Sequence, residues 1–113
     1  MPEQLLAQRL RCLPTAAVLG REVRVAGGPR ARLLGLAYLN RVEVGPGLLI
    51  PRCSSVHTFA MRFPLDLYFL GPRGEVLAVR REVPARRFAF CGGAKAVLEL
   101  PSEEGGEISA AVS

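Results

Sequence analysis

The feature that most constrains the fold is a pair of apolar segments joined by a short turn in the second half of the chain. Residues 65–70 read LDLYFL, in which Leu65, Leu67 and Phe69 recur at every second position. A period of two is typical of a β-strand. The next four residues, Gly-Pro-Arg-Gly, place a proline where it sets the first φ angle of a turn. Residues 75–81 then return as a second strand, so the sequence predicts a β-hairpin.

Other short apolar segments extend this pattern to a mainly β (α+β) fold. The further predicted strands are residues 15–26, 48–50, 95–100 and 108–112. An amphipathic helix is predicted at residues 30–39, and a second helix at residues 2–13. Phe88 and Phe90 are expected to anchor the basic connection at residues 83–87 to the core. Many short strands with one or two short helices predict a small curled sheet or a barrel-like domain.

Length and composition predict a single globular domain. The chain has 113 residues, which fits one domain, and half of them are hydrophobic while 22% are charged. We expect residues 1–20 to form a loosely packed N-terminal segment and residues 21–113 to form the core. No segment approaches the ~20 apolar residues needed to cross a bilayer, so membrane insertion is not expected.

Charge and cysteine content narrow the classes of partner and compartment. The net charge is +5, and arginine supplies the excess because Lys95 is the only lysine. A GC-rich genome explains this usage, and no nucleic-acid-binding motif accompanies it, so specific nucleic-acid binding is not expected. RNA binding by a basic face stays as an alternative that salt-dependent gel shifts would reveal.

The three cysteines, Cys12, Cys53 and Cys91, are odd in number and lack CxxC spacing. This predicts reduced thiols, a cytoplasmic location, and neither a metal nor another cofactor.

Several segments resemble one known family. The segment at residues 47–66, which ends in CSSVHTFAMRFPLD, resembles the signature of the bacterial branch of the domain of unknown function 192 family. Residues 32–36 look like that family's Arg-Leu-Gly-Leu helix, and residues 97–101 look like its closing strand. Residues 84–86 look like its Pro-Trp-Arg connection, with Ala85 in the place of the tryptophan.

The resemblance runs from about residue 21 to the C-terminus and departs from the family pattern at two turns. Gly71 stands where an acidic residue usually opens the hairpin turn, and residues 102–104 interrupt the usual Pro-Ala-Gly ending. The resemblance brings no established activity, so it assigns no catalytic residue. Genes of the family often lie near secretion or pilus genes, which implies an accessory role in such systems.

Polar side chains gather within and after the central motif. The candidates for ligand binding are Cys53, His57, Thr58, Arg62, Asp66 and Arg86. His57 is the only histidine and suits a general base or a metal ligand, but the preferred explanation is a ring that caps a loop by bonding to the backbone. A metal site would need further ligands, for which Asp66 and Cys91 are the only plausible donors, so no metal site is expected.

Asp66 is the candidate that physical chemistry constrains most. Its neighbours Leu65, Leu67 and Phe69 share one face of the strand and are expected to point into the core, so Asp66 lies on the opposite face. A covered carboxylate is costly unless it is bonded or paired. We therefore expect Asp66 to accept hydrogen bonds from His57, Thr58 or Arg62 in the loop before the strand, with Arg62 or Arg86 as its ion-pair partner.

The sequence is compatible with three functions from different classes. The first is a binding or accessory module for an unknown protein partner or a small anionic ligand. The second is a small hydrolase or transferase in which Cys53 is the nucleophile and His57 the base. The third is an anion-binding protein with a cleft formed by Arg62, Arg86 and His57.

Overall fold

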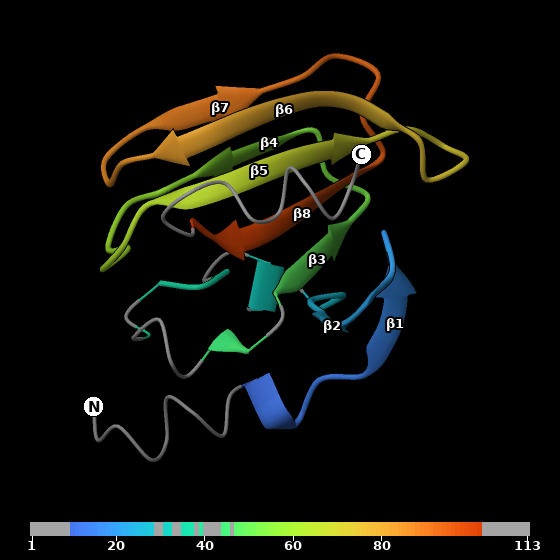
Figure 1. The fold of residues 1–113 in the computed structure, drawn as a ribbon, viewed down its shortest axis with the longest axis horizontal. Helices are drawn as coiled ribbons and strands as arrows, with labels where there is room; N and C mark the ends of the chain where they lie inside the picture. The colour runs from blue at the N-terminus through green and yellow to red at the C-terminus, as the bar shows by residue number, and fades with distance from the viewer. Residues whose placement is uncertain are drawn as a thin grey trace.

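The computed structural model describes residues 10–28, 31–32, 35–37, 39, 44–45 and 47–102. Its eight strands are β1 (Thr15–Val18), β2 (Arg21–Val25), β3 (Leu48–Pro51), β4 (Ser55–His57), β5 (Leu65–Leu70), β6 (Val76–Val83), β7 (Phe88–Phe90) and β8 (Ala96–Pro101). Six of them form a sheet in the order β1-β2-β3-β8-β5-β6, and β4 pairs with β7 in a separate ribbon (Figure 1). The predicted mainly β class is confirmed. The six-stranded sheet has β1 and β6 at its edges and does not close into a barrel.

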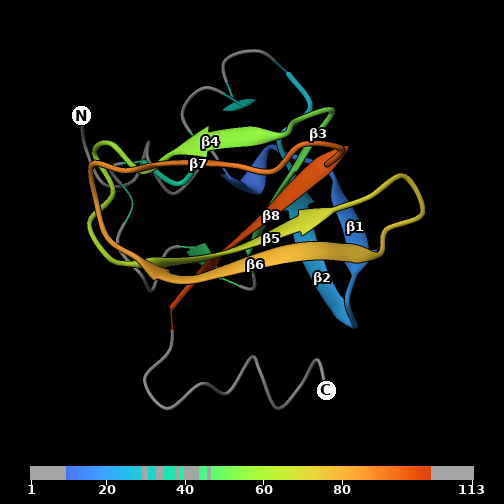
Figure 2. The same ribbon diagram turned by 90° about the horizontal axis from the view of Figure 1, so that it is seen from above.

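The two sheets form two layers. The β4–β7 ribbon lies over one face of the twisted six-stranded sheet (Figure 2). Val56 of β4 belongs to the same core cluster as Leu65, Leu67 and Phe69 of β5. This larger cluster fills the space between the layers, because apolar side chains from both layers are buried there. No helix in the described part of the chain is long and apolar enough to cross a membrane.

The hairpin at the centre of the sequence prediction is confirmed. β5 pairs antiparallel with β6, and the turn is closed by bonds from the Gly71 amide to the Glu75 carbonyl at 2.8 Å and from the Gly74 amide to the Gly71 carbonyl at 3.0 Å. β5 also pairs with β8 on its other side, so it is an interior strand. All six residues of β5 are buried, and alternation divides the five other than Asp66 between two core clusters.

The division of β5 follows the predicted alternation. Leu65, Leu67 and Phe69 belong to the larger cluster, as expected. Tyr68 and Leu70 belong to a smaller cluster on the opposite face, together with Val23, Leu98 and Leu100. The face that carries Asp66 is therefore a second buried surface of the sheet.

The prediction of one strand at residues 15–26 was wrong, because this segment is itself a hairpin. β1 pairs antiparallel with β2, and Val18 lies opposite Arg21. Leu19 and Gly20 form the two-residue turn with positive φ angles of 49° and 76°. Positive φ at both positions matches the twist of the flanking strands. The sequence hides this turn because leucine is unusual at the first of these positions.

The expectation that Phe88 and Phe90 anchor their connection in the core was also wrong. Their side chains are 78% and 66% exposed. They lie on β7, whose inward residue is Ala89, opposite Val56 of β4. Because side chains of a strand alternate between its faces, an inward Ala89 places both phenylalanines outside.

The helix predictions are only partly covered by the described residues. Ala31 and Arg32 are helical, and hydrogen bonds of the i→i−4 type join the Arg32 amide to the Gly28 carbonyl and the Gly35 amide to the Ala31 carbonyl. Residues 30, 33, 34, 38 and 40–43 lie outside the described part. In the predicted N-terminal helix, Leu10 and Arg11 are helical and residues 1–9 are outside it. The predicted strand at 108–112 also lies outside.

Candidate functional site

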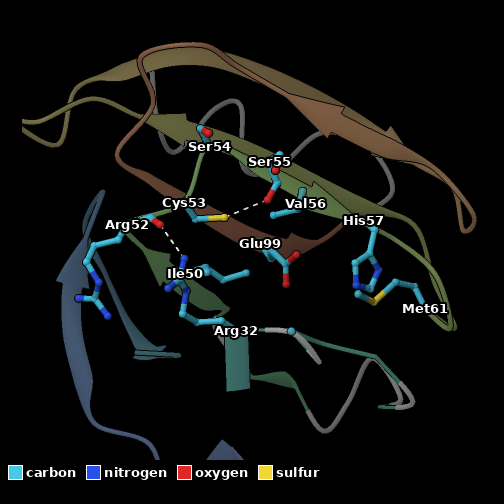
Figure 3. Close-up of a pocket in the computed structure, with 11 residues that line it drawn as sticks. Arg32, Ile50, Arg52, Cys53, Ser54, Ser55, Val56, His57, Met61 and Glu99 are labelled. Carbon is cyan, nitrogen blue, oxygen red and sulfur yellow. Dashed lines mark hydrogen bonds between the residues drawn. The ribbon is translucent and has the colours of Figure 1, made fainter. Parts of the chain in front are cut away.

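A cavity of about 520 Å³ lies between the larger sheet and the segments that cover it. Arg32 approaches it from one side, Ser55 and Val56 border it on the other, and Glu99 projects between them from β8 (Figure 3). Gly35, Arg52, Cys53 and Ser54 also line it. His57 and Met61 complete one end of the wall. Ligand sites in proteins are concave spaces of this size with a few polar groups among apolar walls, so the cavity is the candidate functional site.

Glu99 is the most unusual residue of the cavity. It lies in register with Leu48 of β3 and Leu67 of β5, both fully buried, and is itself 1% exposed. It shares its face of β8 with Val97, a member of the larger core cluster. Burial raises the pKa of Glu99 from 4.5 to about 8, against a smaller lowering by a hydrogen bond from the Leu36 backbone. At neutral pH this carboxyl is therefore mainly uncharged.

Gly35 allows the backbone to approach this carboxyl closely. Its φ angle is +52°, a conformation that glycine adopts without penalty. A Cβ atom at this position would lie 2.9 Å from Oε1 of Glu99. The glycine thus lets the backbone lie directly against the carboxyl oxygen, where a side chain would collide.

Arg32 brings a guanidinium to the same cavity. Its Nη2 donates to the Arg52 carbonyl at 2.6 Å, while Nη2 of Arg52 donates to the Gly27 carbonyl at 3.0 Å. Nε of Arg32 is buried without a hydrogen-bond partner, and so is Oε1 of Glu99. No ion pair joins Arg32 to Glu99 within the part of the chain that the structure describes. Two buried polar atoms of residues at one cavity are therefore left without a partner from the described part of the chain.

Cys53 and His57 line the cavity but do not act on each other. The Cys53 thiol donates to the Ser55 carbonyl at 2.9 Å. Nδ1 of His57 accepts the Phe59 amide at 3.3 Å, which is the loop-capping role that was the alternative explanation for this histidine. A nucleophile–base pair needs a hydrogen bond between its two members, and here each side chain bonds to the backbone instead.

The other loop candidates lie outside this cavity. Thr58 is buried and joins its loop to the connection before β7: its hydroxyl donates to the Pro84 carbonyl at 2.6 Å and accepts the Arg87 amide at 2.9 Å. Arg62 and Arg86 are exposed and do not line the cavity with His57. The structure therefore brings together only Cys53 and His57 of the residues suggested by the sequence.

The partners predicted for Asp66 were wrong, although the carboxylate is buried and bonded. Oδ1 accepts the Ser102 hydroxyl at 2.6 Å and the Glu82 amide at 2.9 Å. Its ion-pair contact is with Arg81, at 3.8 Å, rather than with Arg62 or Arg86. The loop at residues 57–62 packs on the opposite face of the sheet, since Met61 belongs to the larger cluster, so it cannot reach this carboxylate.

A β-bulge explains which groups Asp66 binds. Leu65 lies opposite Val83, and Leu67 lies opposite Arg80. Two residues of β6, at positions 81 and 82, therefore lie opposite one residue of β5, Asp66. The bulged Glu82 has a φ of +52°, and its amide bonds to the Asp66 side chain. Such a bulge leaves one residue out of the ladder, and here the carboxylate satisfies its freed amide.

Sequence reasoning missed Glu99 and Arg32 as site residues. The signal for Glu99 was present in residues 97–100, which read VLEL. A strand that is apolar at both odd and even positions is buried on both faces, so a single acid within it is buried as well. Arg32 carried no such signal, because only the folded chain brings it beside β8. In the described residues, no group of three or more His, Cys, Asp or Glu side chains is arranged to hold a metal ion.

Comparisons with known proteins agree on the fold. A protein of unknown function from Novosphingobium aromaticivorans superposes with a TM-score of 0.64 at 20% identity, covering 86% of this chain and 74% of the other. A protein described as a "putative transcription regulator" from Sinorhizobium meliloti superposes with a TM-score of 0.68 at 22% identity, covering 88% and 84%. No curated protein matches the chain significantly. Residues 14–110 match DUF192, described as "Uncharacterized ACR", and the chain therefore belongs to this family, as its motifs predicted.

Proposed function

We propose that this domain binds a small ligand in the cavity between the larger sheet and the β4–β7 ribbon. The observation that carries this proposal is the pair of buried atoms without partners, Nε of Arg32 and Oε1 of Glu99, at the same cavity. Buried polar groups in folded proteins nearly always have a hydrogen-bond partner. A ligand that bonds to both atoms would supply what the chain does not.

The energetic cost of these two groups supports a binding role. A buried donor or acceptor without a partner costs about 1–3 kcal/mol. Val and Leu residues occupy the neighbouring positions of β8, and a leucine at position 99 would avoid the cost of burying the carboxyl. Costs of this kind are typical of functional sites, where a group is kept for a task other than stability.

Binding fits the cavity better than nucleophilic catalysis does. The Cys53 thiol and the His57 ring are bonded to separate backbone groups. Asp66, for which His57 was one of the expected donors, bonds instead to Ser102 and Glu82. The prediction of an accessory role beside secretion or pilus systems, like that of a cytoplasmic location, rests on the sequence alone and stays a prediction.

Protection of Cys53 from alkylation tests the proposal. In a Cys12→Ser/Cys91→Ser variant, Cys53 is the remaining thiol, and it lines the cavity. Mixtures of small carboxylates, amides and amines would be screened by amide chemical shifts, and any hit then added during labelling with iodoacetamide. We expect the hit to shift the Gly35 and Ser55 amides and to slow the labelling of Cys53.

The matched control keeps a different half-buried thiol. A Cys12→Ser/Cys53→Ser variant retains Cys91, which does not line the cavity, and its labelling should not respond to the ligand. If no compound shifts the cavity amides, or if Cys91 is protected as strongly as Cys53, the cavity is not a ligand site. Its two polar atoms would then be satisfied by water alone.

A further inference from the structure

We infer that the ligand of this cavity is a small carboxylic acid in its anionic form, held by Arg32 and by Glu99 acting as a hydrogen-bond donor. This inference rests on the proposed function, since it names the class of molecule for that site. The Nε–H of Arg32 can only donate, and it has no acceptor from the chain.

The histidine at the cavity wall adds a second donor. Nδ1 of His57 accepts the Phe59 amide, so in the neutral ring the proton is on Nε2. The thiol of Cys53 already donates to the Ser55 carbonyl. The polar groups of the site are therefore rich in donors, and they favour a ligand rich in acceptors.

The charge of the cavity points the same way. Among the described residues, Arg32 and Arg52 line it, and Glu99 is the one acidic side chain there. Lys95 lies with Arg52 and Cys53 at an adjoining hollow. An ionised Glu99 would be a buried charge with no ion-pair partner, which its apolar neighbours Leu48 and Leu67 oppose. With Glu99 uncharged, the arginines that line the cavity leave it positive, which suits an anion.

A carboxylate matches the two unpartnered atoms in number and in kind. One of its oxygens can accept from Nε of Arg32 while the other accepts the O–H of Glu99. Phosphate would carry more charge and need more donors than these. The remaining walls include Ile50, Val56 and Met61, so they suit an apolar body attached to the carboxylate. The volume of about 520 Å³ admits a molecule of modest size.

The inference predicts a specific pH dependence of binding. Among the described residues, the ionisable groups that line the cavity with Glu99 are Arg32 from the helical segment, and Arg52, Cys53 and His57 from the β3–β4 segment. The neighbours of Glu99 on β3 and β5, Leu48 and Leu67, are apolar. Burial places the pKa of Glu99 at about 8. A carboxylate that needs the O–H of Glu99 loses affinity as pH rises through that value, by about tenfold between pH 7 and pH 9.

Three molecules of similar shape and different charge test the class: butyrate, butyramide and butylammonium. Their dissociation constants would be measured from the Gly35 and Ser55 amide shifts in a Cys53→Ser background, which removes the thiol from the cavity. We expect butyrate to bind at pH 7 and the other two to bind at least tenfold more weakly. Affinity for butyrate should fall about tenfold by pH 9.

Glu99→Gln is the decisive variant, because a glutamine amide also donates but does not titrate. It should keep the affinity for butyrate at pH 7 within about threefold and lose the change between pH 7 and pH 9. Arg32→Lys keeps a cation but removes the planar Nε donor, and it should weaken butyrate binding about tenfold. The amide spectra of both variants show whether they are folded.

Two results would overturn the inference and are distinguishable from each other. If butyramide or butylammonium binds the cavity better than butyrate, and Glu99→Gln abolishes that binding, then Glu99 acts as an acceptor. The carboxylate class is then wrong, while the proposed binding function stands. If none of the three shifts the cavity amides at millimolar concentration, both the ligand class and the proposed function fail.

Discussion

Because of Glu99, the free energy of unfolding should decrease as pH rises. The decrease occurs in the pH range in which this carboxyl is neutral in the folded protein and ionised in the unfolded chain. Its pKa is 4.5 in a solvated chain and about 8 in the fold. Between these values the folded protein binds a proton that the unfolded chain has released, so the free energy of unfolding falls with rising pH. The loss is small below pH 4.5, accumulates up to about pH 8, and is complete above it.

The magnitude follows from the size of the shift. One pKa unit corresponds to about 1.4 kcal/mol, so titration between pH 5 and pH 8 should remove about 3–4 kcal/mol of unfolding free energy. A domain of this size has a total stability of about 5–15 kcal/mol, so the effect is large. Urea unfolding at pH 5, 6.5 and 8, followed by circular dichroism, would measure it.

Glu99→Gln is the control that isolates this carboxyl from His57 and the other titrating groups. Glutamine keeps nearly the same shape without ionising, so the variant should show only the pH dependence of the remaining groups. From pH 5 to pH 8, the free energy of unfolding of the wild type should therefore fall by about 3–4 kcal/mol relative to that of the variant. Parallel stability curves for the wild type and the variant would refute the reasoning, since Glu99 would then titrate alike in both states.

Three further predictions concern stability and are measured by the same urea unfolding. Asp66→Ala should lower the free energy of unfolding by about 1–3 kcal/mol, because it leaves the Ser102 hydroxyl and the Glu82 amide without their acceptor. Asp66→Asn should lower it less, and equal unfolding midpoints for the wild type and both variants would contradict this. Thr58→Val should lose about 1–3 kcal/mol by removing the bonds to Pro84 and Arg87, whereas Thr58→Ser should stay near the wild type. Phe90→Ser should change the free energy of unfolding by less than about 0.5 kcal/mol, whereas Leu67→Ala should lower it by about 2–5 kcal/mol. A similar loss for both variants would contradict the exposed placement of Phe90.

The parts of the fold that could be predicted are those in which neighbouring residues determine the structure. In β5 and β6, a period of two and a proline-glycine turn specify a hairpin without help from distant segments. The turn at Leu19 and Gly20 could not be predicted, because its positive φ at leucine is sustained by the pairing of β1 with β2. The outward placement of Phe88 and Phe90 depends on which face of β7 the β4 strand and the core cover, and that is a tertiary property.

The candidate site shows the same limit for side chains. Cys53 and His57 were found because polar residues in a short motif attract attention, and both do line the cavity. Their roles differ from the proposed catalytic pair, since hydrogen bonds to nearby backbone groups satisfy them first. Glu99 and Arg32 are 67 positions apart in the sequence, and only the packing of the helical segment against β8 brings them to one cavity.

The two buried carboxyl groups of the sheet separate a structural role from a binding role. Asp66 and Glu99 lie on adjacent strands and face opposite sides of the sheet. Asp66 accepts two hydrogen bonds from the chain, and Arg81 lies close to its second oxygen. Glu99 receives one backbone bond, and its buried Oε1 has no hydrogen-bond partner among the described residues. If both served stability alone, both would be satisfied by the chain, because burial penalises each of them in the same way. The asymmetry is the reason to assign Asp66 to the bulge that it stabilises and to look for the partner of Glu99 outside the chain.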